Sequence, residues 1–339
     1  MTCAITFCGA IKPGVTLAKT IVVENGIILA QRPAPNAFLF AFSEVPVRDI
    51  ASLTEAIEAA AERREIAVRA KANRRQGRRA IYDDPEKGPA GLTVVPRCWV
   101  AFDWDGIEAD GDPLTQPEIG VLHALRRLPP AFRDVSCAWQ VSASAGFKPG
   151  FRLRTWHWLN HPTTGGEMKV WCGPAIQRNL LDPVTLVECQ PHYLAVRVEA
   201  GPDPCPNRFG ILGGDRDEVL VPDIAGIKRR QDQRDREARR QAEGNCPMWR
   251  DSDQANAYAQ RRIDECLATI RSATARHTAY THEAARARAI CERYGLAWPP
   301  VRQALISAYE STLTATEANA RRSSSTEGVL RWIERRSAA

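Results

Sequence analysis

The sequence lacks several patterns that would assign a function directly. Its ten cysteines are scattered without a C-x-x-C pair, which excludes a zinc ribbon and a regular disulfide framework and indicates free thiols. It has no helicase P-loop of the form G-x-x-x-x-G-K-[ST]. No apolar run approaches the roughly 18 residues that span a bilayer, and no basic segment precedes a long apolar core at the N-terminus. We therefore expect a soluble, cytoplasmic protein without a membrane partner.

Length and charge set the next limits. The chain has 339 residues, of which 44% are hydrophobic, so about two domains with real cores are expected. Lys and Arg total 46 against 40 Asp and Glu, a net charge of +6. Arginine clusters first indicate a solvated surface and only second a face that binds polyanions. No internal repeat of about 20 to 50 residues is found.

Hydrophobic periodicity predicts an α/β (α+β) domain with a mixed sheet over residues 1–222. Asn25-Gly26 predicts a turn between two strands, and Ser52 or Thr54 is expected to cap a helix over 50–68. Pro129-Pro130 is expected to stop a second helix. The further elements expected in this domain are helices over 116–128 and 166–181 and strands around 135–146, 151–160, 193–198 and 209–212.

The composition changes near residue 223. Residues 223–250 are highly charged and predict a solvent-exposed helical linker. Residues 251–339 are rich in alanine with helical periodicity, so a small all-α helical bundle is expected there. Its predicted helices lie near 253–272, 279–294, 299–312 and 326–336.

Two carboxylates close the apolar run Arg97-Cys-Trp-Val-Ala-Phe-Asp-Trp-Asp-Gly106. Asp103 and Asp105, the acidic pair, are two positions apart in a segment of strand character. Residues i and i+2 of a strand point to the same side, about 7 Å apart along the backbone. Such a pair can hold Mg²⁺ or Mn²⁺ for nucleotidyl transfer, while an acidic strand end before a surface turn explains the same residues. The neighbouring motifs have to decide.

A small-residue segment between two predicted strands, Ser142-Ala-Ser-Ala-Gly-Phe-Lys-Pro-Gly150, is the second candidate and is called the serine turn below. The hydroxyls of Ser142 and Ser144 and free backbone N–H groups can cradle phosphates, Gly146 allows close approach and Lys148 supplies charge. A plain hairpin loop has the same composition.

The strand that follows carries basic residues on one face. Alternation places Arg152 and Arg154 on the same face as Trp156 and Trp158, where the arginines can meet bound phosphates. His157 falls on the opposite face as a packed or partly exposed histidine, and it is kept among the candidate nucleotide-binding residues.

Three further segments complete the candidates. Asp182 is an isolated acid where a predicted helix ends, and the polar atoms of Gln190-Pro-His192-Tyr193 can touch a base or a template phosphate. Residues 69–79, the basic segment, are expected to form a loop that approaches DNA phosphates. Its basic residues are Arg69, Lys71, Arg74, Arg75, Arg78 and Arg79.

The order of these motifs resembles the archaeo-eukaryotic primase superfamily, and more narrowly the primase module of phage and plasmid replication proteins. The resemblance covers roughly residues 15–222, and Arg276-His277 with Glu283-Ala-Ala-Arg resembles the helical primase C-terminal domain of such proteins. It is carried by Leu128-Pro-Pro-Ala-Phe-Arg, Val141-Ser-Ala-Ser-Ala-Gly, Trp156-His-Trp-Leu-Asn-His-Pro162, Gln190-Pro-His-Tyr and Arg208-Phe-Gly-Ile-Leu.

The resemblance implies a nucleotidyltransferase with an RRM-like sheet that synthesises primers on single-stranded DNA from nucleoside triphosphates, helped by a separate replicative helicase. The acidic pair and Asp182 would coordinate two Mg²⁺ or Mn²⁺ ions, and Ser142 with Ser144 would contact the triphosphate. One departure stands out, because the position that is usually histidine in the second motif is Arg154 here. An arginine can neutralise phosphate oxygens but cannot donate a proton.

Arg154 therefore keeps a second hypothesis open, a catalytically impaired primase-like protein that binds DNA as a replication initiator. A DNA-nicking relaxase is disfavoured, since His157 and His161 are not separated by a single apolar residue. Zinc chemistry of the H-E-x-x-H type is excluded for the same segment because no glutamate follows His157.

Overall fold

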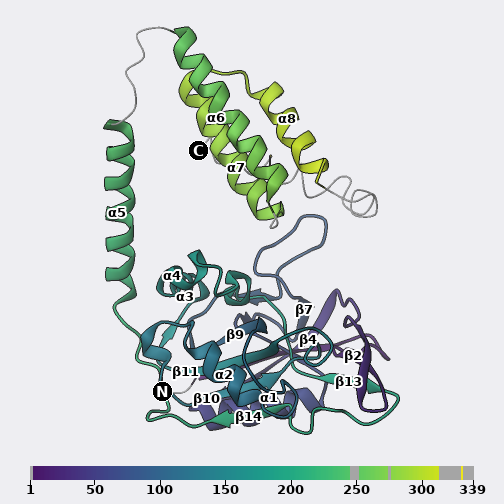
Figure 1. Ribbon diagram of the computed structural model, residues 1–339. Coiled ribbons are helices and arrows are strands. Elements are labelled where there is room, and N and C mark those ends of the chain that lie inside the picture. Colours follow the sequence, from purple (N-terminus) through teal and green to yellow (C-terminus); the bar gives the residue numbers. More distant parts are fainter. Residues whose placement is uncertain (1–2, 245–251, 274–275, 313–329, 331–339) are drawn as a thin grey trace. The chain divides into compact units, whose positions relative to one another are not determined.

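The structure is a computed structural model that describes residues 3–244, 252–273, 276–312 and 330 (Figure 1). It is a mixed α/β protein with several sheets. The chain divides into two compact units, one ending at Glu237 and one beginning at Ala238. The helix α5 (Ile224–Gly244) starts where the charged linker was predicted, and the division between the units falls inside it rather than at residue 222.

The first unit contains a five-stranded sheet with the order β12-β5-β1-β4-β7. Its central strand is buried on both sides: Ile5 and Phe7 belong to one hydrophobic cluster, and Cys8 belongs to another. The strands are β1 (Cys3–Ala10), β4 (Leu39–Val47), β5 (Ile66–Val68), β7 (Gln76–Arg78) and β12 (His192–Tyr193).

A four-stranded antiparallel sheet with the order β14-β10-β11-β9 carries the acidic pair and the serine turn's flanking strands. One face packs with α2 on the largest cluster, which includes Phe102 and Phe132. The other face packs against α1 and β1 through Trp99 and Trp156. The strands are β9 (Arg97–Ile107), β10 (Cys137–Val141), β11 (Phe151–Thr163) and β14 (Phe209–Leu212).

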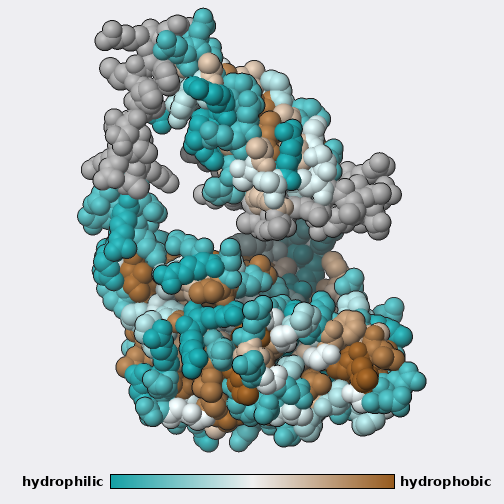
Figure 2. All heavy atoms as spheres, in the orientation of Figure 1, coloured by the Kyte–Doolittle hydropathy of each residue, from teal (hydrophilic) through white to brown (hydrophobic). Residues whose placement is uncertain are grey.

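Two smaller sheets complete the unit. In the first, β2 (Lys19–Glu24) and β3 (Ile27–Arg32) form the predicted hairpin, because Asn25 and Gly26 both adopt the positive φ that such a turn requires. The strand β13 (Val196–Glu199) pairs parallel to β2. Figure 2 shows hydrophobic residues on the surface in this region, and Ile27 and Leu29 of the edge strand β3 are exposed there. The second small sheet consists of β6 (Lys71–Ala72) and β8 (Leu92–Thr93).

Two predicted helices of this unit differ in extent. The first, α1 (Ile50–Glu62), is capped by Asp49, which accepts a hydrogen bond from the backbone of Ser52 in a capping box. It ends earlier than predicted, because Arg64 turns into the left-handed region and β5 follows. The helix predicted over 166–181 is two short ones, α3 (Gly165–Trp171) and α4 (Gly173–Gln177), with a proline in the first turn of α4.

The helix expected over 116–128 is α2 (Pro117–Leu125), which ends before Pro129. Two short 3₁₀ turns that the sequence did not predict are η1 (Pro130–Phe132) and η2 (Pro183–Leu186).

The second unit contains three described helices, α6 (Ser252–Ser272), α7 (Arg276–Tyr294) and α8 (Trp298–Glu310). They share one hydrophobic cluster, in which the rings of Tyr280 and Tyr309 stack at 4.6 Å. The helix predicted over 326–336 lies outside the described residues apart from Leu330. Within the described part of the chain, no helix is both long enough and apolar enough to cross a membrane.

Candidate functional site

One face of the four-stranded sheet changes from apolar to polar at the same level on three neighbouring strands. On β9 the buried Trp99 and Ala101 give way to the acidic pair. On β10 the buried Ala138 is followed two positions later by Gln140, and on the antiparallel β11 the buried Trp156 is preceded two positions earlier by Arg154. Because residues at i and i+2 share a face, the hydrophobic core between the sheets continues directly into a polar site.

The register of β9 and β11 brings each aspartate opposite an arginine, a pairing that alternation along the separate strands did not predict. Asp103 lies opposite Arg154 and Asp105 lies opposite Arg152. Arg154 Nε donates to Asp103 Oδ1, and Arg152 Nη2 donates to Asp105 Oδ1 at 2.6 Å. The Asp103 side chain is 31% exposed and the Asp105 side chain is 74% exposed. The inner ion pair is therefore the stronger one, since solvent screens the outer pair.

Arg154 is held on several sides. Its Nη1 donates to Gln140 Oε1 at 3.1 Å and to the Tyr193 carbonyl at 3.0 Å. Burial on its own would raise the pKa of Asp103, but the charge and the hydrogen bond of Arg154 outweigh it, so the pKa lies below its usual value. Asp103 is consequently a carboxylate in the neutral pH range.

The serine turn joins this row of charges. Ser142 Oγ and Ser144 Oγ are 2.8 Å apart, and Arg152 Nε donates to Ser144 Oγ at 3.0 Å. Gly146 has a positive φ of 74°, and a Cβ there would come within 2.7 Å of Leu114, so this glycine is required by packing. The predicted close approach of Gly146 to a phosphate is not needed to explain it. Lys148, within the same turn, is exposed.

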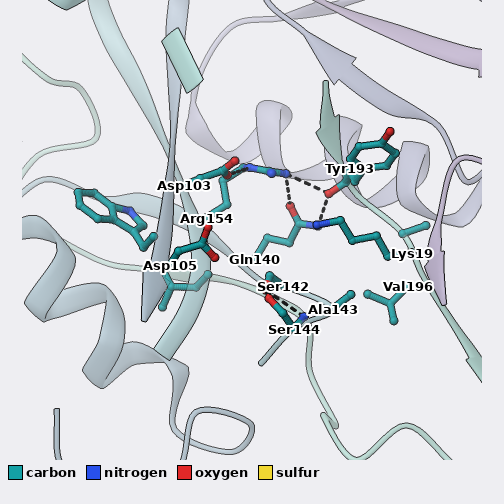
Figure 3. A pocket seen from close by; sticks show the side chains of 13 residues that line it. Lys19, Asp103, Asp105, Gln140, Ser142, Ala143, Ser144, Arg154, Tyr193 and Val196 are labelled. Atoms are coloured by element: carbon teal, nitrogen blue, oxygen red, sulfur yellow. Dashed lines mark hydrogen bonds and ion pairs between the residues drawn. The ribbon is translucent and has the colours of Figure 1, made fainter. Parts of the chain in front are cut away.

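A pocket opens between this row and β2 (Figure 3). Asp103 and Asp105 lie on one side, and Lys19 and Val196 lie on the other. The pocket is lined by Lys19, Asp103, Trp104, Asp105, Gln140, Ser142, Ala143, Ser144, Leu153, Arg154, Tyr193, Ala195 and Val196.

Sequence reasoning missed several residues of this pocket. Gln140 is two positions before Ser142 on a strand, so period-two alternation could have found it. Lys19 could not be found this way, because it reaches the pocket through the parallel pairing of β2 with β13. Arg208 was seen only as part of a motif, yet it donates to the Ser142 carbonyl and forms a two-point ion pair with Asp203.

The structure does not bring Asp182 to the acidic pair. Asp182 is exposed and caps the 3₁₀ turn η2, where its side chain accepts a hydrogen bond from the Val184 N–H at 2.9 Å. It is not among the residues that line the pocket. A proline follows it, and this favours a capping role at the start of a turn. The three-carboxylate centre expected from the sequence is therefore reduced to two carboxylates.

Two histidines that were predicted to contact nucleotide or DNA, His157 and His192, are buried. His157 is fully buried between Phe102 and Phe132 on the face away from the pocket, and its Nε2 lies 3.1 Å from Thr155 Oγ1. His192 is fully buried against Trp156. Burial lowers the pKa of each histidine to about 3, so both are neutral in the protein at neutral pH. Direct nucleotide or DNA contact by these rings is excluded by their burial, whereas Tyr193 lines the pocket and Gln190 is partly exposed.

The basic segment is not a continuous loop. Arg69 is buried, donates to the Trp99 carbonyl and to the Thr163 carbonyl, and cannot reach DNA. Arg79 donates to the Cys189 carbonyl, and Arg78 donates to the carbonyls of Tyr82 and Gly88. The guanidinium groups of these arginines are therefore engaged by backbone carbonyls of the same unit. The segment's remaining predicted DNA contacts, both of them exposed side chains, are Arg74 and Arg75.

The acidic pair offers the carboxylate oxygens that a divalent cation such as Mg²⁺ takes as ligands. In the described part of the chain, no group of three or more His, Cys, Asp or Glu side chains could hold a metal ion. The hydrogen bonds of the described residues engage Oδ1 of each aspartate and leave Oδ2 of each unused. One or two carboxylates are sufficient for Mg²⁺ when substrate phosphates supply other ligands. The residues therefore fit a cation that arrives with a nucleotide.

The comparisons with known proteins add no analogue. Against protein-family models, curated proteins and solved structures, the chain gives no significant match. The interpretation of the pocket therefore depends on its own geometry and chemistry.

Proposed function

We propose that the chain is a DNA primase or primase-polymerase of the archaeo-eukaryotic primase type, which transfers nucleotidyl groups on a single-stranded DNA template. The single observation that supports this most is the pairing of β9 with β11. It sets two carboxylates, two guanidinium groups and the serine turn side by side at one pocket. Carboxylates for a divalent cation next to donors for phosphate oxygens are what triphosphate chemistry requires.

In this proposal the residues at the pocket have separate roles. Asp103 and Asp105 would hold Mg²⁺ or Mn²⁺, which would stabilise the charge on the leaving pyrophosphate. Arg152 and Arg154 carry the planar donors that match phosphate oxygens, and the serine hydroxyls add neutral donors. Tyr193 lines the same pocket, so its ring can contact a base.

The finer parts of the proposal concern the whole chain. They are an RRM-like sheet in the catalytic domain, a helical C-terminal bundle and a cytoplasmic location. The template would be held through salt-sensitive contacts of Arg74 and Arg75 with phosphates. A separate helicase would supply single-stranded template.

Primer synthesis on single-stranded DNA with Mg²⁺ or Mn²⁺ tests the proposal. We expect product from the native chain and at least about a hundredfold less from Asp103→Ala plus Asp105→Ala. A hundredfold loss corresponds to about 2.7 kcal/mol of transition-state stabilisation. The matched control, Glu108→Ala plus Asp110→Ala, removes two exposed acids that follow β9 and leaves the pocket intact. Equal product from the native chain and the acidic-pair variant would rule out this site.

One observation favours a second candidate, an impaired primase-like protein that binds DNA and nucleotide without polymerising. Both carboxylates are already paired with arginines, and Asp182 is not beside them. An arginine in place of the usual histidine competes with a cation for Asp103 and cannot transfer a proton. Arg154→His separates the two candidates. Product from this variant but not from the native chain would establish impairment, whereas product from the native chain would reject it.

A further inference from the structure

Lys19 is a cation of the pocket that has no ion-pair partner in the described part of the chain. The acidic pair is taken up by Arg152 and Arg154. The ammonium group of Lys19 instead lies 5.8 Å from the centre of the Tyr193 ring. An aromatic face attracts a cation but does not neutralise it. Lys19, Arg152 and Arg154 therefore place three positive charges beside two carboxylates, although Arg152 is not among the residues that line the pocket.

The surroundings of Lys19 disfavour its charge. Burial lowers its pKa first, and the positive charges of Arg154 and Lys148 act in the same direction. The acidic pair opposes these effects only in part, so the pKa remains below the usual value. An anion bound next to Lys19 would relieve both the loss of solvent and the repulsion.

The position of Lys19 limits the shape of such an anion. The lysine is fixed on β2 by the parallel pairing of residue 19 with Val196. The serine turn lies on a different side of the pocket (Figure 3). A ligand that contacts both Lys19 and the serine hydroxyls has to be extended and has to carry charged oxygens along its length. A chain of phosphoryl groups meets both conditions.

We propose that Lys19 is a polyphosphate-binding residue and that it anchors the triphosphate of an incoming nucleotide. Its ammonium group can donate to a phosphate oxygen without opening either ion pair of the acidic pair. Polyphosphate binding at Lys19 consequently does not require a divalent cation. The identity of the ligand as a nucleoside triphosphate rests on the proposed function, whereas polyanion binding at Lys19 does not.

Calorimetric titration of the full chain with inorganic tripolyphosphate, without divalent metal, tests the proposal. We expect Lys19→Met to weaken binding at least about tenfold, because a charged hydrogen bond worth about 1.5 kcal/mol or more is lost. Lys19→Arg should retain most of the affinity. Lys12→Met, which removes an exposed lysine before β2, should leave the affinity unchanged. Equal affinity of the native chain and Lys19→Met, or no binding by the native chain, would overturn the assignment.

A second measurement needs no variant. Tripolyphosphate should slow acylation of the Lys19 amine but not of the Lys12 amine, as followed by mass spectrometry of the native chain. Equal protection of the two lysines would contradict the proposal.

Primer synthesis separates this proposal from the proposed function. A native chain that makes no primer, with tripolyphosphate binding lost in Lys19→Met, would reject the polymerase and keep the polyphosphate site. Primer synthesis by Lys19→Met with an unchanged KM for the nucleotide would keep the polymerase and reject the polyphosphate site at Lys19.

Discussion

Replacing Arg154 by methionine should destabilise the protein mainly through Asp103. The substitution keeps an unbranched apolar stem but removes the partner of a carboxylate that is only 31% exposed, together with a hydrogen bond to Gln140. The Tyr193 carbonyl keeps its hydrogen bond from Gln140 Nε2 at 3.0 Å. A partly buried carboxylate left alone and one lost hydrogen bond together cost about 3 kcal/mol.

The pH dependence of this loss is predicted as well. In the native protein the pKa of Asp103 is below its ordinary value of 3.8, so its stabilising contribution is present above pH 3.8 and is lost as the pH falls through the lower, folded value. Without Arg154 the effect of burial remains, and the pKa of Asp103 should rise above 3.8. The difference in stability between native chain and variant should therefore be largest near neutral pH and shrink as the pH approaches 3.8.

Urea denaturation followed by circular dichroism measures this difference, and a double-mutant cycle with Asp103→Asn isolates the pair. We expect a coupling energy of about 2 kcal/mol for Asp103 with Arg154. The matched control is Asp105 with Arg152 on the same two strands, where the 74% exposure of the aspartate should reduce the coupling below about 1 kcal/mol. Equal coupling of the two pairs, or a difference that does not change with pH, would refute the reasoning.

Other predictions follow from the buried polar groups. Burial lowers the pKa of His157 to about 3, so below about pH 6.5 the unfolded chain binds a proton that the folded protein excludes. As the pH is lowered from 6.5 to 3, this histidine should therefore reduce the free energy of unfolding by about 1.4 kcal/mol per pH unit. His157→Phe should reduce that slope in urea titrations at several pH values, and the exposed control His161→Gln should not. Arg69→Met should lower the melting temperature by roughly 6 to 12 °C, since a buried donor to two carbonyls is removed at about 3 kcal/mol, and it should leave the salt dependence of DNA binding unchanged. Arg74→Ala plus Arg75→Ala should instead leave the melting temperature unchanged and lower the slope of log affinity against log salt by up to about 2 in fluorescence anisotropy. An altered melting temperature in the Arg74 and Arg75 variant, or an altered slope in the Arg69 variant, would count against this assignment.

Local patterns predicted much of the first unit. The hairpin at Asn25-Gly26 forms because both residues take up positive φ, which local sequence specifies. Alternation along each strand places Asp103 with Asp105, and Arg152 with Arg154, on one face. The antiparallel register of the two strands then brings the aspartates opposite the arginines, and the sequence did not predict that register. Charge alone was misleading for the basic segment, because Arg69 looks the same in the sequence whether it meets solvent or a buried carbonyl.

Residues brought together by tertiary pairing were not predictable in the same way. Lys19 enters the pocket through a parallel partner far along the chain, and no local pattern marks it. Asp182 illustrates the reverse case, since a lone acid before a proline fits a turn cap as well as a metal ligand. Motif order by itself does not choose between these roles, because the choice depends on where η2 packs.

The parallel pairing of β2 with β13 also determines how early the first unit can fold during translation. Residue 19 leaves the ribosome early, but its partner strand ends only at Glu199. Until then β2 and β3 are a two-stranded ribbon, which is marginally stable alone. Closing so long a loop is slow and costly in entropy. The nascent chain consequently has no completed pocket beside Lys19 until nearly the whole first unit has been made.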